Sequence, residues 1–180
     1  HYSNRVVSNF LEKSAENGID IFRTFDALND FENIDFTIRE VKRIGKHAQG
    51  TIAYTTSPVH DLNTWLDLAK KIEDAGADSL AIKDMAGLLR PFDAYELVKN
   101  LKSTLSIPIH MQTHATTGMS TATNMKAIEA GIDNIDTSIS SLSMTYGHTA
   151  TETMLAIFED QERVINLDLS ALEEVSIFFK

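Results

Sequence analysis

The sequence contains no cysteine and has few basic residues relative to acidic ones. A chain without thiols forms no disulfide, offers no thiolate to a metal and has no cysteine nucleophile. The same absence fits a reducing compartment, and we expect a cytoplasmic protein. Lys and Arg total 16 against 26 Asp and Glu, which sets a formal net charge of −10. Because this charge repels phosphate backbones, we expect no nucleic-acid partner.

Long apolar runs and glycine-rich phosphate loops are also missing. No apolar run approaches the roughly 20 residues that a transmembrane helix needs. Neither G-x-G-x-x-G nor G-x-x-x-x-G-K followed by Ser or Thr occurs, which argues against a doubly wound nucleotide-binding sheet. With 43% apolar and 23% charged residues among 180, the composition is that of a globular domain. The chain begins at His1 rather than methionine, so we expect part of a longer protein.

A helical pattern that ends at glycine and runs into a short apolar strand recurs along the chain, for example at Gly18, Gly76 and Gly131. Glycine takes the positive φ that ends a helix, and the short turn after it feeds a strand. Strands are predicted near residues 21–25, 51–55, 79–83, 107–113 and 134–138. Helices are predicted near residues 4–17, 31–48, 62–75, 91–103, 119–130 and 149–160, and Ser170 is expected to cap one more.

The predicted strands are short and apolar at consecutive positions, as in parallel strands that helices cover. We therefore predict an α/β fold of about five βα units in a single domain, residues 1–180. A (β/α)8 barrel needs eight strands and about 250 residues. The sequence is thus interpreted as the C-terminal part of a TIM barrel, whose N-terminal strands lie outside it.

Lys83 and His114 each stand where an apolar strand is predicted to end. The carboxyl ends of neighbouring parallel strands converge on one cleft, so both side chains are expected there. A lysine at a strand end is commonly solvated or salt-bridged. If it is desolvated instead, its ammonium pKa falls, and the neutral amine can act as a base, form a Schiff base or form a carbamate. Asp84, beside it, is either a charge partner or a turn residue.

His110, Gln112 and His114 occupy alternating positions, so they are expected on the same face of their strand. Three polar side chains on one face need bonding partners. Two histidines at this spacing would clamp a metal, but the pair nearest the strand end is Gln112 and His114, and glutamine is an uncommon, neutral ligand. A structural role for each histidine stays open at this point.

Several segments together resemble one family of enzymes. The segments are residues 21–30, 54–60, 81–89, 114–118 and 136–148. They are similar to the carboxyltransferase barrel shared by oxaloacetate decarboxylase α subunits, transcarboxylase and pyruvate carboxylase. The run KDMAG at residues 83–87 is specific to this group, and the forms ATTG and MTYGH look closer to the oxaloacetate decarboxylase branch than to pyruvate carboxylase.

The resemblance implies a biotin-dependent oxaloacetate decarboxylase, a lyase that transfers a carboxyl group between oxaloacetate and biotin and releases pyruvate. The biotin is expected on a carrier domain that is not in this chain. Other expected partners are membrane subunits of a decarboxylase complex and further copies of the same chain in a homo-oligomer.

The resemblance also implies a metal site. Lys83 matches a carbamylated, catalytic lysine that ligates a divalent metal, His114 matches the second histidine ligand, and Gln112 takes the place of the first. Carbamate and imidazole together suit zinc, manganese or cobalt. An aspartate ligand and a substrate-binding arginine are expected on the earlier strands, so this piece is expected to be inactive alone.

Two alternatives remain open. One is a metal-dependent aldolase or acyl-condensing barrel of the isopropylmalate synthase type, against which Lys83-Asp84-Met85 argues, since those enzymes do not use a carbamylated lysine. The other is a non-catalytic barrel for binding or assembly, in which Gln112 marks a degraded metal site.

Overall fold

The computed structural model describes residues 2–159 and 167–180, and its centre is one parallel sheet in the order β1-β2-β3-β4-β5. The strands are β1 (Ile21–Thr24), β2 (His47–Ala53), β3 (Ser79–Asp84), β4 (Ile109–Thr113) and β5 (Asn134–Ile135). The helices are α1 (Asn4–Glu16), α2 (Phe31–Arg43), α3 (Leu62–Asp74), α4 (Pro91–Thr104), α5 (Ser120–Glu129), the 3-10 helix η1 (Ser140–Leu142), α6 (Thr151–Phe158) and α7 (Leu169–Phe178).

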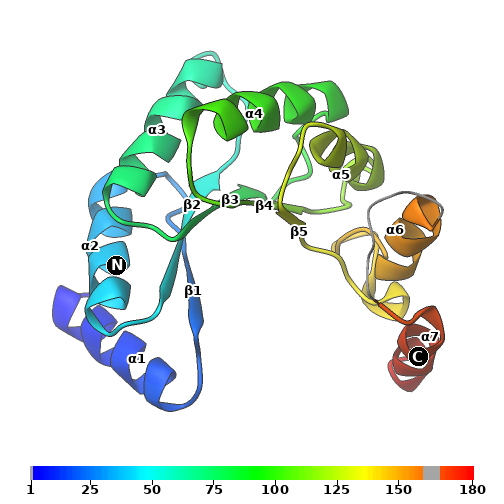
Figure 1. Ribbon diagram of the computed structural model, residues 1–180, viewed down its shortest axis with the longest axis horizontal. Coiled ribbons are helices and arrows are strands. Elements are labelled where there is room, and N and C mark those ends of the chain that lie inside the picture. Colours follow the sequence, from blue (N-terminus) through cyan, green and yellow to red (C-terminus); the bar gives the residue numbers. More distant parts are fainter. Residues whose placement is uncertain (1, 160–166) are drawn as a thin grey trace.

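The helices lie in an arc around the sheet. Figure 1 shows α2, α3, α4 and α5 along its outer side, while the inner face is turned toward the open centre of the arc. Each strand pairs in parallel with the next one along the chain. This arrangement confirms the predicted α/β class with parallel βα units. None of the helices in the described ranges combines the length and hydropathy that a transmembrane span requires.

Several predicted boundaries are wrong, among them the end of the strand expected at 134–138, which stops at Ile135. The helix expected to reach residue 48 ends at Arg43, because Gly45 takes the left-handed conformation (φ 71°) and turns the chain. The strand expected at 51–55 therefore begins earlier, at His47, which pairs with Ile21 of β1. At the other end of the chain, Asp168 rather than Ser170 caps α7, since its carboxylate accepts the backbone N–H of Ser170.

The core lies between the sheet and its outer helices. Leu80 and Ile82 of β3 are completely buried, and in the sheet they lie beside Ile109 and Met111 of β4. At Gly50 of β2 the helix approaches so closely that a Cβ atom would lie 2.2 Å from Cγ2 of Ile72 in α3. Burial of these apolar side chains supplies the main stabilising term of the fold.

Alternate positions of the strands face the inner side of the sheet, and many of them are polar. They are Arg23, Gln49, Ser79, Lys83, His110 and Gln112, joined to one another and to neighbouring residues by hydrogen bonds. The interior of an ordinary (β/α)8 barrel is filled by branched apolar side chains. Polar groups in such a place need partners, and their concentration here marks the inner face as a functional surface.

Candidate active site

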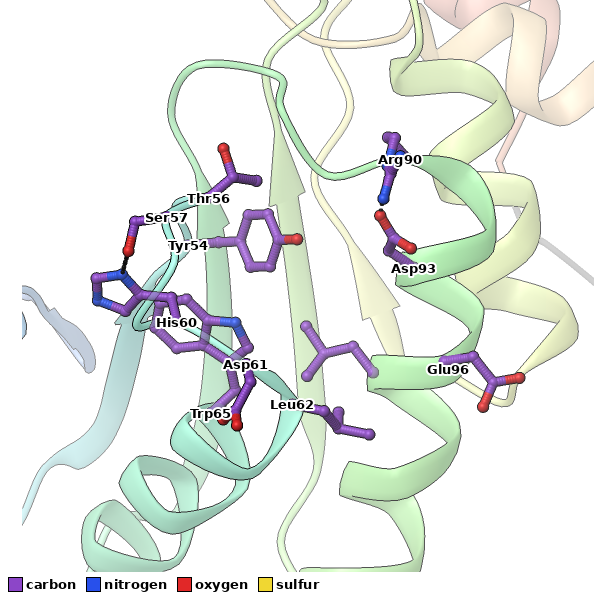
Figure 2. A pocket seen from close by; sticks show the side chains of 11 residues that line it. Tyr54, Thr56, Ser57, His60, Asp61, Leu62, Trp65, Arg90, Asp93 and Glu96 are labelled. Atoms are coloured by element: carbon purple, nitrogen blue, oxygen red, sulfur yellow. Dashed lines mark hydrogen bonds and ion pairs between the residues drawn. The ribbon is translucent and has the colours of Figure 1, made fainter.

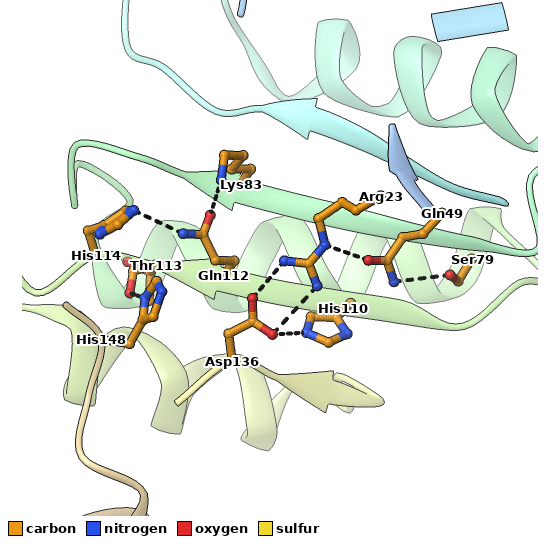
Figure 3. A network of polar contacts seen from close by, with 10 residues as sticks. All are labelled: Arg23, Gln49, Ser79, Lys83, His110, Gln112, Thr113, His114, Asp136 and His148. Carbon is orange, nitrogen blue, oxygen red and sulfur yellow. Dashed lines mark hydrogen bonds and ion pairs between the residues drawn. The ribbon is translucent and has the colours of Figure 1, made fainter. Parts of the chain in front are cut away.

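Lys83, Gln112 and His114 form a continuous row of contacts at the carboxyl ends of β3 and β4 (Figure 3). The sheet register places Lys83 directly beside Gln112. Lys83 Nζ donates to Gln112 Oε1 at 3.2 Å, and Gln112 Nε2 lies 3.0 Å from Nε2 of His114. The structure thus brings together all three side chains that the sequence analysis selected as metal ligands.

The orientation of the His114 ring follows from its second contact. Its Nδ1 lies 2.7 Å from the backbone oxygen of Tyr146. A carbonyl oxygen only accepts, so Nδ1 carries the proton and donates, and the lone pair of the neutral ring is on Nε2. Nε2 faces Gln112, whose amide N–H donates to it. A backbone carbonyl that fixes the tautomer in this way is a common support for a metal-ligating histidine.

Asp84 is a turn residue, which decides between the two roles open to it. It is completely buried, and its carboxylate accepts the backbone N–H groups of Leu88 and Leu89 and the hydroxyl of Thr113. Its backbone oxygen accepts the N–H of His114 at 3.1 Å. Asp84 therefore ties the loop after Lys83 to the end of β4, which holds the two strand ends in a common register.

A second network on the same face surrounds Arg23. Its Nε donates to Gln49 Oε1 and its Nη1 to Asp136 Oδ2, both at 2.6 Å. Asp136 also bonds Nε2 of His110. Burial alone would raise the pKa of Asp136, but the hydrogen bonds and charges of His110 and Arg23 outweigh it and hold that pKa well below its ordinary value. Asp136 is thus an anion at neutral pH, and it fixes the guanidinium in place.

The surroundings of Lys83 shift its ionisation toward the neutral amine. Burial lowers the pKa of the Lys83 ammonium, the positive charge of Arg23 lowers it further, and Asp136 offsets part of the effect. The ring of Phe25, whose centroid lies 5.4 Å from Lys83 Nζ, acts in the opposite direction, because a cation–π contact stabilises the ammonium. Because only the unprotonated amine is a nucleophile, this lowered pKa increases the fraction of Lys83 that can react with an electrophile such as CO2.

The donor set fits a divalent metal on one condition. Within residues 2–159 and 167–180, no three or more His, Cys, Asp or Glu side chains gather as a metal site. The row formed by Lys83, Gln112 and His114 supplies an imidazole lone pair and an amide oxygen. It becomes a suitable ligand set for zinc, manganese or cobalt only when Lys83 adds an anionic oxygen as a carbamate.

Sequence reasoning missed Arg23, Gln49 and Asp136. The substrate-binding arginine that the resemblance implies on earlier strands stays a prediction, and Arg23 on β1 is a further arginine on the inner face. The available signal was a polar residue at alternate strand positions, since Arg23 lies two residues after Ile21 and two before Phe25, and Gln49 pairs with it across β1 and β2. The pairing with Asp136, which lies far along the sequence, had no such signal.

The segment 54–60, which carried part of the resemblance, begins beside Lys83, since the backbone N–H of Tyr54 donates to the backbone oxygen of Lys83 at 2.9 Å. It lines a cavity of about 290 Å³ between α3 and α4 (Figure 2). There the His60 ring stacks on Trp65 with centroids 4.9 Å apart, and Ser57 Oγ contacts His60 Nδ1 at 2.7 Å. None of the residues in the Lys83 row lines this cavity.

The sequence matches a protein-family model and several known proteins. A family model described as HMGL-like matches residues 21–178. The methylmalonyl-CoA carboxyltransferase 5S subunit of Propionibacterium freudenreichii subsp. shermanii is 47% identical over 100% of this chain and 36% of the relative. A pyruvate carboxylase subunit of Methanocaldococcus jannaschii is 45% identical over 99% of this chain and 32% of the relative. The chain thus spans about a third of the length of these relatives.

The similarity extends to solved structures. The carboxyl transferase domain from Rhizobium etli pyruvate carboxylase, solved with pyruvate, superposes with a TM-score of 0.96 at 34% sequence identity. The match covers 99% of this chain and 31% of that chain.

Proposed function

We propose that this chain, which belongs to the HMGL-like family, supplies part of the carboxyltransferase site of a biotin-dependent enzyme. In the whole protein, the reaction would transfer a carboxyl group between oxaloacetate and biotin, with pyruvate as the other product. The observation that carries the proposal is the contact of Lys83 with Gln112 and His114 at the carboxyl ends of β3 and β4. Similarity to carboxylases and a carboxyltransferase supports the same reaction class.

Lys83 is proposed to act as a carbamate. The lone pair of its amine adds to the carbon of CO2, one C=O electron pair moves onto oxygen, and the nitrogen loses a proton to solvent. The product is an anion that, with His114 and Gln112, would hold a zinc, manganese or cobalt ion. When bound, such an ion supplies a Lewis acid that polarises the keto oxygen of the substrate.

Arg23 is proposed to attract the substrate. Oxaloacetate is a dianion, and Arg23 presents a fixed positive charge on the same face as Lys83. Gln49 and Asp136 hold the guanidinium on two sides, which limits its rotation and leaves it oriented before the substrate arrives. Pre-orientation of a charged donor lowers the cost of stabilising the negative charge that develops as the carboxyl group leaves.

Replacement of Lys83 tests the proposal. In the full-length protein, Lys83→Ala is expected to abolish pyruvate formation from oxaloacetate, because no carbamate can form, while circular dichroism stays that of the parent. Pyruvate release can be followed with a coupled lactate dehydrogenase assay. Lys71→Ala, at an exposed lysine of α3, is the matched control and should leave turnover unchanged. Normal turnover in Lys83→Ala would contradict the assignment.

A non-catalytic barrel for binding or assembly is the second candidate, and the observation in its favour is Gln112 where the resemblance implies a histidine. Metal analysis of the full-length protein separates the two. A stoichiometric divalent ion that is lost in Lys83→Ala supports the enzyme, whereas a full-length protein that binds no ion favours the second candidate. An acyl-condensing activity is not proposed, since the relatives named above are carboxylases or a carboxyltransferase.

Several features of the whole protein stay predictions. They are the decarboxylase direction of the reaction, a biotin carrier domain, membrane subunits, assembly as a homo-oligomer and a cytoplasmic location.

A further inference from the structure

Gln112 uses both ends of its side-chain amide at the centre of the site. Oε1 accepts from Lys83 and Nε2 contacts Nε2 of His114, at 3.2 and 3.0 Å. Only 4% of Gln112 is exposed to solvent. Loss of either contact would therefore leave a buried amide group without a partner, which is costly. The orientation of this amide is dictated by what its two neighbours demand.

The present orientation of the amide fits an unmodified Lys83 and a His114 ring that is protonated on Nδ1. Lys83 carries an amine, which donates, so the amide must turn its oxygen toward it. His114 donates through Nδ1 to the oxygen of Tyr146, so its Nε2 offers a lone pair and the amide must turn its N–H toward it. Both demands are met by the same orientation, and each contact reinforces the other.

A carbamate on Lys83 would require Gln112 to donate a hydrogen bond, whereas the amine requires it to accept one. The group then ends in two oxygens that only accept, and they repel the amide oxygen that faced the amine. Turning the amide over lets its N–H donate to the carbamate. The same turn brings Oε1 to the side of His114, where it meets the lone pair of Nε2. Two acceptors that face each other are satisfied together by a cation.

We propose that the Gln112 amide is a two-position switch that couples capture of CO2 by Lys83 to cation binding beside His114. With the amine, Gln112 blocks the His114 lone pair with its own N–H. With the carbamate, it releases that lone pair and adds an oxygen ligand. The inference rests on the proposed function, because it needs the carbamate. It assigns Gln112 a positioning role, whereas a residue that only marks a lost histidine ligand would have none.

The switch makes a prediction for protein without metal. In protein without metal, the hydrogen bond to His114 holds the Gln112 amide with its oxygen toward Lys83, and this oxygen repels a carbamate. His114→Ala removes this hold, so the carbamate on Lys83 should become more abundant by about fivefold, the effect of one neutral hydrogen bond. In a Gln112→Leu background there is no amide to hold, and His114→Ala should change the carbamate fraction little. A ligand role of His114 contributes to neither result, since no metal is present.

The measurement is 13C NMR of the carbamate carbon in full-length protein, with EDTA and a 13C-bicarbonate concentration low enough that Lys83 of the parent is carbamylated only to a small extent. Lys83→Ala identifies the signal by removing it, and thermal unfolding checks that each variant is folded. Equal carbamate fractions in the parent and His114→Ala overturn the switch, as does an equal effect of His114→Ala in the Gln112→Leu background. Absence of the Lys83 signal in the parent, both with EDTA and with Zn²⁺, overturns the proposed carbamate and the switch together.

Discussion

Single residues at the strand ends carry the chemistry proposed for this chain. Burial and the charge of Arg23 lower the pKa of Lys83, which suits its proposed reaction with CO2, and the oxygen of Tyr146 fixes the tautomer of His114, which suits its proposed role as a ligand. Neither property belongs to the amino acid alone. Each depends on a neighbour that another element of the fold supplies.

Gln112 gives a direct test at this scale. Gln112→His is expected to strengthen Zn²⁺ binding by about tenfold, since an imidazole nitrogen is a better zinc donor than an amide oxygen. Competition with a chromophoric chelator, at fixed bicarbonate, measures the affinity in the full-length protein. Asn63→His, at an exposed site on α3, controls for an added surface histidine. An affinity unchanged from that of the parent would mean that position 112 does not face the ion.

At the scale of elements, close contact between helix and strand positions the site. Gly50 allows α3 to lie directly on β2, and the register of β2 with β3 then places Ala53 beside Lys83. The contact of Gly50 with α3 on the outer side of the sheet and the position of Lys83 on its inner side therefore both depend on the pairing of β2 with β3.

Gly50→Ala is expected to destabilise the fold by about 2 kcal/mol, because the new methyl group overlaps Cγ2 of Ile72 and the packing must shift. Urea unfolding measures the change. Ile72→Ala removes the overlapping atom, so the double variant should be more stable than the sum of the two single effects predicts. Strict additivity of the two free-energy changes would show that the two side chains do not meet in this way.

At the scale of the whole molecule, one ion pair joins the two ends of the sheet. Arg23 stands on β1 and Asp136 follows β5, and their contact crosses the inner face between the first and last strands. The pair orders a curved sheet whose edge strands share no backbone hydrogen bonds with each other in the described chain.

Asp136→Asn is expected to lower the free energy of unfolding by about 2 kcal/mol at neutral pH, the scale of hydrogen bonds to a charged group. The pKa of Asp136 in the folded state lies below the ordinary carboxyl value of 3.8. Its contribution is therefore complete above that value and declines as the pH falls below it. The difference between parent and variant in urea unfolding should accordingly narrow on the acid side.

Asp67→Asn, at an exposed carboxylate of α3, is the matched control and should change the free energy of unfolding little at either pH. A difference between the parent and Asp136→Asn that stays constant from neutral pH to well below 3.8 would contradict the ionised pair.

The amino-acid sequence by itself determined the local features of this protein. Glycine turns and apolar runs predicted the βα units, and the ends of those runs placed Lys83 and His114 on one rim. The beginning of β2 at His47 was missed because the helical pattern before it was extended past Gly45, although the polar residues from His47 on alternate as in a strand.

Only the tertiary structure decided the rest. The partnership of Arg23 with Asp136 and the two contacts of Gln112 depend on the register and curvature of the sheet. Local patterns reflect which side of a strand or helix is buried, because burial repeats with the period of the element. They carry no information about which distant side chains meet, because that depends on how all the elements pack together.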